Sequence, residues 1–282
     1  MESISSNQVY AVTVWYHPTQ READVIRLYQ PNIAGVIVVD NSNEDNSVLL
    51  ADNPSVIYLP LRANKGIAAA LNAGCLKAQE LGAVWALTMD QDSRWDQHTV
   101  AQYIAEVNAC ADIEKTAIFS PYHDCDGHPE THHQKGRYQH MHVVMCSGNL
   151  LRLSAWKTAG MFDESYFIDI VDDEMCCRLR QNGWFVIRAN NILLTHHLGN
   201  GVQFVGFTKH QYVAHAAWRY YYIARNIRRT MRRYPEEKKY YRRQVWKYTK
   251  RLCLYDWTDK SAKLRSFIQG WYDGRVDPTR IA

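Results

Sequence analysis

Two carboxylates separated by one residue are the clearest chemical feature of the sequence. Asp90 and Asp92 flank Gln91 directly after the apolar run Ala83–Met89, which predicts a buried strand. Side chains alternate along an extended chain, and such a pair can turn both acids toward one hard cation. A divalent metal that carries a diphosphate fits this pattern. The same acids could instead cap a following helix, and the triplet alone does not separate the two interpretations.

A second group of acids follows roughly eighty residues later. Asp169 and Asp172–Glu174 crowd the start of a helix predicted to run from Asp172 to Gln181. Because negative charge stabilises a helix N-terminus, a structural role is one interpretation. The other is a general base, since repulsion among neighbouring carboxylates raises the pKa of at least one of them.

The elements that must position these acids alternate between strand and helix patterns, which predicts parallel βαβ units. In such sheets ligands bind outside the carboxyl ends of the strands. Asp40 ends one predicted strand, and Asp90 directly follows another. The predicted strands are Val9–Trp15, Gly35–Asp40, Ser55–Leu59, Ala83–Met89, Thr116–Ser120, His142–Cys146 and Leu150–Leu153, and the predicted helices are Thr19–Gln30, one opened by Gly66, and Gln97–Ala109.

The stretch Pro121–Tyr138 is too long and irregular for a routine connection, and we expect a loop at the site. It is rich in potential zinc ligands. Their spacing matches no standard zinc finger, so a loop that covers the site is the preferred interpretation. The residues concerned are His123, Cys125, His128, His132 and His133.

Composition bounds the class of protein. The chain has 282 residues and 46% hydrophobic content, enough for one large domain with an appendage or for two modest domains. It contains no run of the ~18 apolar residues that a spanning helix needs, and its start lacks the features of a signal peptide. We therefore expect a cytoplasmic protein. Seven cysteines without a C-x-x-C pair indicate reduced thiols.

Charge is unevenly distributed along the chain. Between Arg219 and Arg251 there are 13 Lys and Arg against Glu236 and Glu237, whereas the rest of the chain has 20 basic and 27 acidic residues. Aromatic residues interleave these cations, a pattern found in nucleic-acid binding and at membrane surfaces. We favour peripheral membrane contact and no nucleic acid. The alternative is packing on the catalytic domain or on the second subunit of a homodimer.

With its motifs taken in order, the sequence resembles family-2 glycosyltransferases of the GT-A fold, and in particular their rhamnosyltransferase branch. The resemblance covers about residues 9 to 226 and implies an α/β fold with a Rossmann-like, mostly parallel central sheet flanked by helices. The segments that carry it are Val12–Pro18, Val38–Ser42, Asn64–Ala68, Ala70–Gly74, Met89–Ser93, Ser147–Asn149, Gly160–Glu164, Phe167–Glu174, Arg178, His196–Gly199 and the R-x-Y-Y-x-x-R-N-like element from Arg219 to Asn226.

The resemblance also implies a domain division and residue roles. It implies a catalytic domain over 1–207, with a nucleotide-sugar part over 1–93 and an acceptor part over 94–207, before a helical region over 208–282. Asp172 is the implied base. Relatives commonly have an apolar residue at the position of Asp173, so the additional acid in this chain leaves Asp173 as the alternative base. The implied donor-binding residues are Thr13, Tyr16, Asp40, Asn41, Asn64, Lys65, Gly66, Asp90 and Gln91, the acceptor-binding residues Ser147, Gly148, Asn149 and Asp169, and the metal ligands Asp92, His196 and Asp90.

The expected activity is inverting, metal-dependent sugar transfer that uses Mg or Mn. We expect L-rhamnose to move from dTDP-rhamnose to a surface polysaccharide or lipid-linked glycan, with other dTDP- or UDP-sugars as candidate donors. The alternatives are a galactofuranosyl- or other hexosyltransferase of this fold, and a noncatalytic protein that binds nucleotide sugars or glycans. A nucleotidyltransferase is disfavoured because no Gly-rich basic phosphate loop follows the first strand.

Overall fold

The structure is a computed structural model that describes residues 3–95, 99–125, 128–129, 136–196, 202–204, 211–213 and 215–276. The chain forms two compact units, and each is described by itself. The first unit consists of Met1–Glu164 with Met175–His197, and the second of Ser165–Glu174 with Leu198–Ala282.

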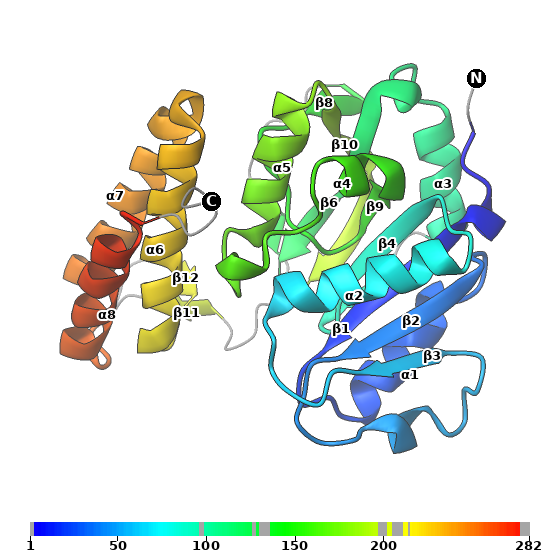
Figure 1. The fold of residues 1–282 in the computed structure, drawn as a ribbon, viewed down its shortest axis with the longest axis horizontal. Coiled ribbons are helices and arrows are strands. Elements are labelled where there is room, and N and C mark those ends of the chain that lie inside the picture. Colours follow the sequence, from blue (N-terminus) through cyan, green and yellow to red (C-terminus); the bar gives the residue numbers. More distant parts are fainter. Residues whose placement is uncertain are drawn as a thin grey trace. The chain divides into compact units, whose positions relative to one another are not determined.

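Four parallel strands form one half of the sheet in the first unit (Figure 1). They are β1 (Val9–Trp15), β2 (Gly35–Asp40), β3 (Ile57–Pro60) and β4 (Trp85–Asp90), in the order β3-β2-β1-β4. In this register Trp15 lies beside Asp40, and Val14 lies beside Asp90. The carboxyl ends of these strands therefore share one edge of the sheet.

The other half of the sheet mixes directions. Beyond β4 lie β9 (Asn149–Arg152), β6 (Thr116–Cys125), β10 (Phe185–His196) and β5 (Ser93–Arg94). β9 is antiparallel to both of its neighbours, while β6 and β10 are parallel. β5 pairs antiparallel with the end of β10, which sets Ser93 beside His196. Two short strands, β7 (His128–Pro129) and β8 (Tyr138–His140), pair with β6 and β10.

Helices cover both faces of this sheet. α1 (Gln20–Tyr29) begins with a capping box between Thr19 and Glu22 and buries Ala23, Ile26 and Tyr29. Together with α3 (Val100–Asn108) it packs in the main core. α2 (Ile67–Glu80) packs on β1, β2 and β4 from the opposite face. The unit also contains α4 (Leu153–Thr158) and most of α5 (Val171–Gln181).

Two local predictions were wrong. Residues 142–146 are not a strand, because their backbone turns back on β4: the Thr88 hydroxyl donates to the carbonyl of Cys146, and the amide of Gly148 donates to the carbonyl of Thr88. The stretch predicted to become irregular at Pro121 instead continues β6 to Cys125. Residues 126–127 and 130–135 of that stretch, which include His132 and His133, lie outside the described residues.

In the described residues of the second unit, three α-helices follow a short hairpin. The hairpin consists of β11 (Val202–Phe204) and β12 (Gln211–Val213), so the region from residue 208 does not begin as a helix. α6 (Ala217–Arg233), α7 (Lys238–Leu254) and α8 (Lys260–Asp273) follow. A buried Asp256 joins them, because it accepts hydrogen bonds from Tyr220 and Lys263. Across the described residues, no helix is long and apolar enough to span a membrane.

Candidate active site

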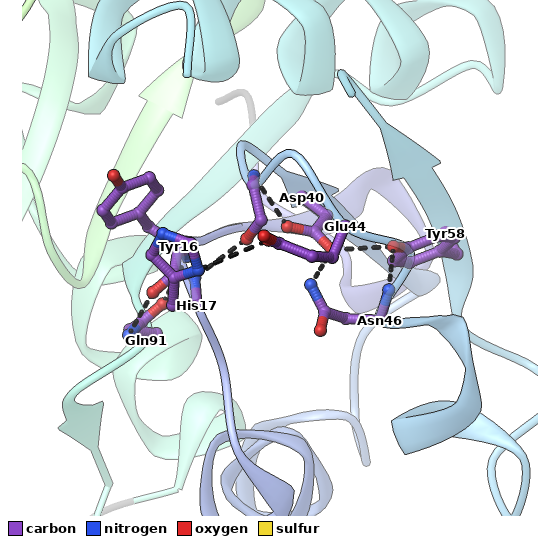
Figure 2. Close-up of polar contacts among 8 residues, drawn as sticks. Tyr16, His17, Asp40, Glu44, Asn46, Tyr58 and Gln91 are labelled. Carbon is purple, nitrogen blue, oxygen red and sulfur yellow. Dashed lines mark hydrogen bonds and ion pairs between the residues drawn. The ribbon is translucent and has the colours of Figure 1, made fainter. Parts of the chain in front are cut away.

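Asp40 organises the loop that follows β2 (Figure 2). Its buried carboxylate accepts hydrogen bonds from the backbone amide of Ser42 at 2.9 Å, the Asn46 side chain at 2.8 Å and the Tyr58 hydroxyl at 2.7 Å. Burial opposes ionisation of Asp40, but these hydrogen bonds outweigh it and lower the pKa of the carboxyl. The anion thus holds residues 41–46 in place. A direct contact between Asp40 and a nucleotide base stays a prediction.

The predicted donor residues Asn41, Asn64, Lys65 and Gly66 are brought together beside that loop. The Asn41 amide donates to Asn64 Oδ1 at 3.0 Å, and Asn41 Oδ1 accepts from the backbone amide of Lys65 at 2.8 Å. Asn64 Oδ1 also accepts from the amide of Gly66 at 3.1 Å. This network fixes the turn that leads into α2, whose N-terminus favours anionic groups.

Gln91 ties the ends of β1 and β4 together (Figure 2). Its side-chain oxygen accepts from the backbone amide of Tyr16 at 2.7 Å, and its side-chain nitrogen donates to the Tyr16 carbonyl at 3.3 Å. The Tyr16 side chain is 46% exposed at this edge. Thr13 differs, because it is buried and shares a 2.6 Å hydrogen bond with the Tyr29 hydroxyl. This contact holds Thr13 in the core, and donor binding by Thr13 stays a prediction.

Asp90, Asp92 and His196 form a cluster that could hold one cation. One potential ligand atom from each lies within 4.8 Å of the others. His196 Nδ1 lies 3.5 Å from Asp92 Oδ1 and 2.6 Å from the Ser93 hydroxyl, which fixes the orientation of the ring. Two carboxylates and an imidazole fit Mg²⁺ or Mn²⁺. The strand pair β5–β10 makes this possible by joining residues that are 103 positions apart.

The predicted acceptor residues Ser147, Gly148 and Asn149 are buried beside the end of β4. The Ser147 hydroxyl accepts from the backbone amide of Asp90 at 3.1 Å, and its carbonyl accepts from buried His123 at 2.7 Å. A Cβ on Gly148, which has φ +78°, would lie 2.6 Å from Leu194. Through its contact with the Asp90 amide, Ser147 helps to hold the Asp90–Asp92 segment in place. Contact between these three residues and an acceptor stays a prediction.

Asn72 connects two motifs that are distant in the sequence. It lies in α2, accepts from the backbone amide of Phe162 at 2.9 Å, and donates to the Phe162 carbonyl and to Glu164, each at 2.9 Å. The segments Ala70–Gly74 and Gly160–Glu164 therefore contact each other in the first unit. Both segments belong to the family resemblance, but the sequence did not predict that they are in contact.

In the second unit, residues 167–170 have an unusual backbone. Phe167, Asp169 and Ile170 have φ values of 61°, 60° and 62°, a region that side chains other than glycine rarely adopt. The buried Asn226 side chain holds this turn, because its amide lies 2.8–2.9 Å from the carbonyls of Tyr166, Ile168 and Asp169. Strain of this kind persists only where surrounding contacts enforce it.

Arg219 and Arg225 complete the support from α6. The Arg219 guanidinium contacts both carboxylate oxygens of Asp169, at 2.8 and 3.1 Å. Arg225 donates to the carbonyl of Ser165 at 2.7 Å and to Asn226 Oδ1 at 3.0 Å. The element from Arg219 to Asn226, noted in the sequence as a motif, thus holds the segment that precedes the candidate base. Asp169 itself is engaged by Arg219, and a contact between Asp169 and an acceptor stays a prediction.

The carboxylates at the start of α5 have different environments within the second unit. Glu174 is buried and accepts from Arg233 at 2.9 Å and from the Tyr234 hydroxyl at 2.6 Å. Asp173 accepts from the Tyr241 hydroxyl at 3.3 Å, and Asp172 accepts from the backbone amide of Asp173 at 3.0 Å. Burial, followed by the charge of Asp172, raises the pKa of Asp173 to about 8. A carboxyl with this pKa suits general-base work near neutral pH.

Comparisons with known proteins identify the family and the fold of this chain. Residues 23–164 match the glycosyl transferase family 2. The chain is 29% identical over 243 residues to the dTDP-rhamnosyl transferase RfbF of Shigella flexneri, and the alignment covers 78% of this chain and 79% of the relative. The fold of this chain is similar to that of GalNAc-T7, solved with UDP, GalNAc and Mn²⁺, with a TM-score of 0.57 at 10% identity.

The structural similarity to GalNAc-T7 covers 80% of this chain, which spans about half, 48%, of that longer protein. It confirms the predicted GT-A fold, an α/β architecture with a mostly parallel sheet and a helical C-terminal part. The family match covers half of the sequence and includes Asp40, the Asn41–Asn64 network and the Asp90–Asp92 pair. The chain is a glycosyltransferase and belongs to glycosyl transferase family 2.

Proposed function

We propose that this enzyme transfers L-rhamnose from dTDP-rhamnose, with inversion and with the help of Mg²⁺ or Mn²⁺, to a surface polysaccharide or lipid-linked glycan. The donor follows from the similarity to a dTDP-rhamnosyl transferase over most of both chains. The metal follows from the cluster of Asp90, Asp92 and His196, which is the observation that carries the proposal. A bound divalent cation would stabilise the negative charge that develops on the leaving nucleoside diphosphate.

The residues of the first unit bind and orient the donor in this proposal. Asp92, Asp90 and His196 are the candidate metal ligands, and Ser93 holds the His196 ring. Asp40, Asn41 and Asn64 shape the nucleotide loop, while the exposed Tyr16 ring offers an apolar face to a base or ribose.

The residues of the second unit supply the base. The acceptor hydroxyl oxygen forms a bond to the anomeric carbon while the bond from that carbon to the diphosphate oxygen breaks. The hydroxyl proton passes to Asp172 or Asp173, and the electron pair of the broken bond leaves with the nucleotide. The raised pKa of Asp173 favours it as the proton acceptor, whereas the resemblance to the family favours Asp172. One displacement of this kind inverts the anomeric centre.

A donor panel tests the substrate and the metal together. Thermal unfolding and turnover should be measured with dTDP-rhamnose, dTDP-glucose, UDP-galactofuranose and UDP-glucose, each with Mg²⁺, Mn²⁺ or EDTA. A ligand that binds only the folded protein raises the unfolding temperature. We expect the largest increase, and turnover, with dTDP-rhamnose and metal. Selective turnover of a UDP-sugar would replace rhamnose in the proposal, and binding of donor without turnover would indicate a noncatalytic protein.

We also propose that α7 contacts the cytoplasmic face of a membrane. Its exposed side carries Lys239, Arg243, Trp246, Lys250 and Leu254 at helical spacing, and Trp246 is 69% exposed. Cations near anionic lipid each gain about 1 kcal/mol. Sedimentation with vesicles of anionic and neutral phospholipid should show retention on the anionic vesicles that falls on Trp246→Ala with Lys250→Ala. Equal retention of that double variant and the wild type would contradict the proposal.

A further inference from the structure

The helices α6 and α8 of the second unit leave a groove lined by aromatic and polar side chains. Its volume is about 740 Å³. It is lined by Trp218, Tyr221 and Tyr222 from α6 and by Arg265, Ser266, Ile268 and Gln269 from α8. Trp218 is 51% exposed and Ile268 is 66% exposed. Both apolar side chains therefore face solvent and are not part of the core.

The groove has a rigid base. Gly270 packs so closely on α6 that a Cβ there would lie 2.0 Å from the carbonyl oxygen of Tyr221. The Tyr221 hydroxyl donates to Asp273 at 3.0 Å, and the Gln269 amide donates to the same carboxylate at 3.0 and 3.1 Å. The side chains of Tyr221 and Gln269 are therefore held in place by contacts within the second unit.

The aromatic rings form a row that leads to the segment of the candidate base. The rings of Trp218 and Tyr222 meet edge to face, with 6.1 Å between their centroids. Tyr222 in turn stacks on Phe167, with 5.0 Å between ring centroids and an interplanar angle of 24°. Phe167 belongs to the strained turn that Asn226 holds, five residues before Asp172. Because Tyr222 lines the groove and stacks on Phe167, one part of the groove lies next to the segment that carries the candidate base.

We propose that this groove binds sugar residues of the acceptor chain beyond the one that is extended. Aromatic rings offer flat apolar faces for the C–H faces of sugars, and Arg265, Ser266 and Gln269 offer hydrogen bonds to hydroxyl groups, as in other ligand sites that combine apolar walls with a few polar groups. A lipid tail would not need the polar side chains. The inference rests on the proposed function only in taking the acceptor to be a glycan.

Binding measurements on the full chain test this groove without requiring turnover. Rhamno-oligosaccharides of one to six sugars should be titrated calorimetrically into the wild type, Trp218→Ala and Trp257→Ala. The Trp257 side chain, 68% exposed and outside the groove, provides the matched control. We expect the hexasaccharide to bind the wild type at least tenfold more tightly than the disaccharide, and Trp218→Ala, but not Trp257→Ala, to lose that gain. Circular dichroism checks that both variants fold.

Several outcomes would overturn the groove proposal. Affinity that does not rise with chain length, or a Trp218→Ala protein that binds the hexasaccharide like the wild type, would do so. Loss of phospholipid-vesicle binding on Trp218→Ala, without loss of sugar binding, would assign the groove to lipid. Failure of the proposed function has a different signature, because the oligosaccharides would still bind while no dTDP-rhamnose is consumed. In transfer assays, Trp218→Ala should raise KM for the hexasaccharide at least tenfold more than KM for the disaccharide.

Discussion

The carboxyl edge of the sheet and the segment Ser165–Glu174 position their acids in different ways. At the edge, regular parallel strands set the places of Asp40 and Asp90, and one side chain, Gln91, links the strand ends. In the segment, the backbone adopts unfavourable φ values and depends on Asn226 and Arg219, which lie about 50 to 60 positions later. The first region should therefore tolerate loss of a functional side chain without unfolding, whereas the second depends on remote residues for its shape.

The largest expected effect is a loss of activity without a loss of stability when an acid at the sheet edge is removed. Asp92→Ala should reduce the transfer rate by about 10³-fold or more, because a lost metal ligand removes stabilisation of the leaving group. The unfolding temperature without ligand should change little. Assays with Mg²⁺, Mn²⁺ and EDTA measure the effect, and Asp52→Ala, an exposed acid of the same unit, is the matched control. Transfer within tenfold of the wild type would remove Asp92 from the metal site.

The next effect concerns the base and its pH dependence. If Asp173 is the base, its pKa of about 8 means that transfer rises with pH up to about 8 and levels off above it. Asp173→Asn should then lower kcat by about 10²- to 10⁴-fold at all pH values. If Asp172 is the base, Asp172→Asn causes that loss, and Asp173→Asn mainly removes the step near pH 8. The pH profiles of the two variants decide between these residues.

The Asp173 carboxyl also affects how stability depends on pH. An acid with a lowered pKa stabilises the folded protein as pH rises, whereas an acid with a raised pKa has the opposite effect. The folded protein keeps the Asp173 proton up to about pH 8, whereas the unfolded chain releases it near pH 4, so the folded state binds more protons in between. The contribution of Asp173 to the free energy of unfolding therefore falls as pH rises from about 4 to 8. Asp173→Asn should flatten this slope in urea titrations at several pH values. An unchanged slope would contradict the raised pKa.

A smaller effect on activity tests the remote support of the second region. Asn226→Ala removes the donor shared by three carbonyls, which should destabilise the protein by about 1–3 kcal/mol. Because the base segment loses its shape, we expect kcat to fall more than tenfold while KM for the donor stays within twofold. Arg232→Ala, an exposed change on the same helix, is the control. A rise in the donor KM as large as the fall in kcat would contradict a role confined to the base segment.

The difference between the two regions also explains how far the sequence predicted the structure. Alternating patterns predicted β1, β2, α1 and β4 closely, and the Asp90–Asp92 pair follows from the end of a strand. The strand and helix patterns did not predict that His196 lies close to Asp92, because this depends on the two-residue strand β5, and only the family resemblance implied it. Nor could the turn at 167–170, since Phe167 and Ile170 give no local signal for positive φ. The sequence marked Ser147–Asn149 as a motif, but only packing shows that Ser147 supports Asp90.

The smallest predicted effect tests whether one side chain links the strand ends of the first region. Gln91→Ala loses both hydrogen bonds to the Tyr16 backbone and should weaken donor binding about tenfold or less, since one such bond contributes about 1 kcal/mol. Isothermal titration with dTDP-rhamnose and metal measures this, and Gln79→Ala on the exposed side of α2 is the control.

Gln91→Glu sharpens the same test, because it keeps the shorter bond from the Tyr16 amide while it loses the donor to the Tyr16 carbonyl. It also places a third carboxylate between Asp90 and Asp92. If Gln91 acts only by linking the strands, Gln91→Glu should bind the donor more tightly than Gln91→Ala. If the added charge repels the diphosphate or competes for the metal, Gln91→Glu should be the weaker binder, with a deficit that shrinks as salt screens the repulsion. The order of the two variants therefore shows whether geometry or charge dominates at the sheet edge.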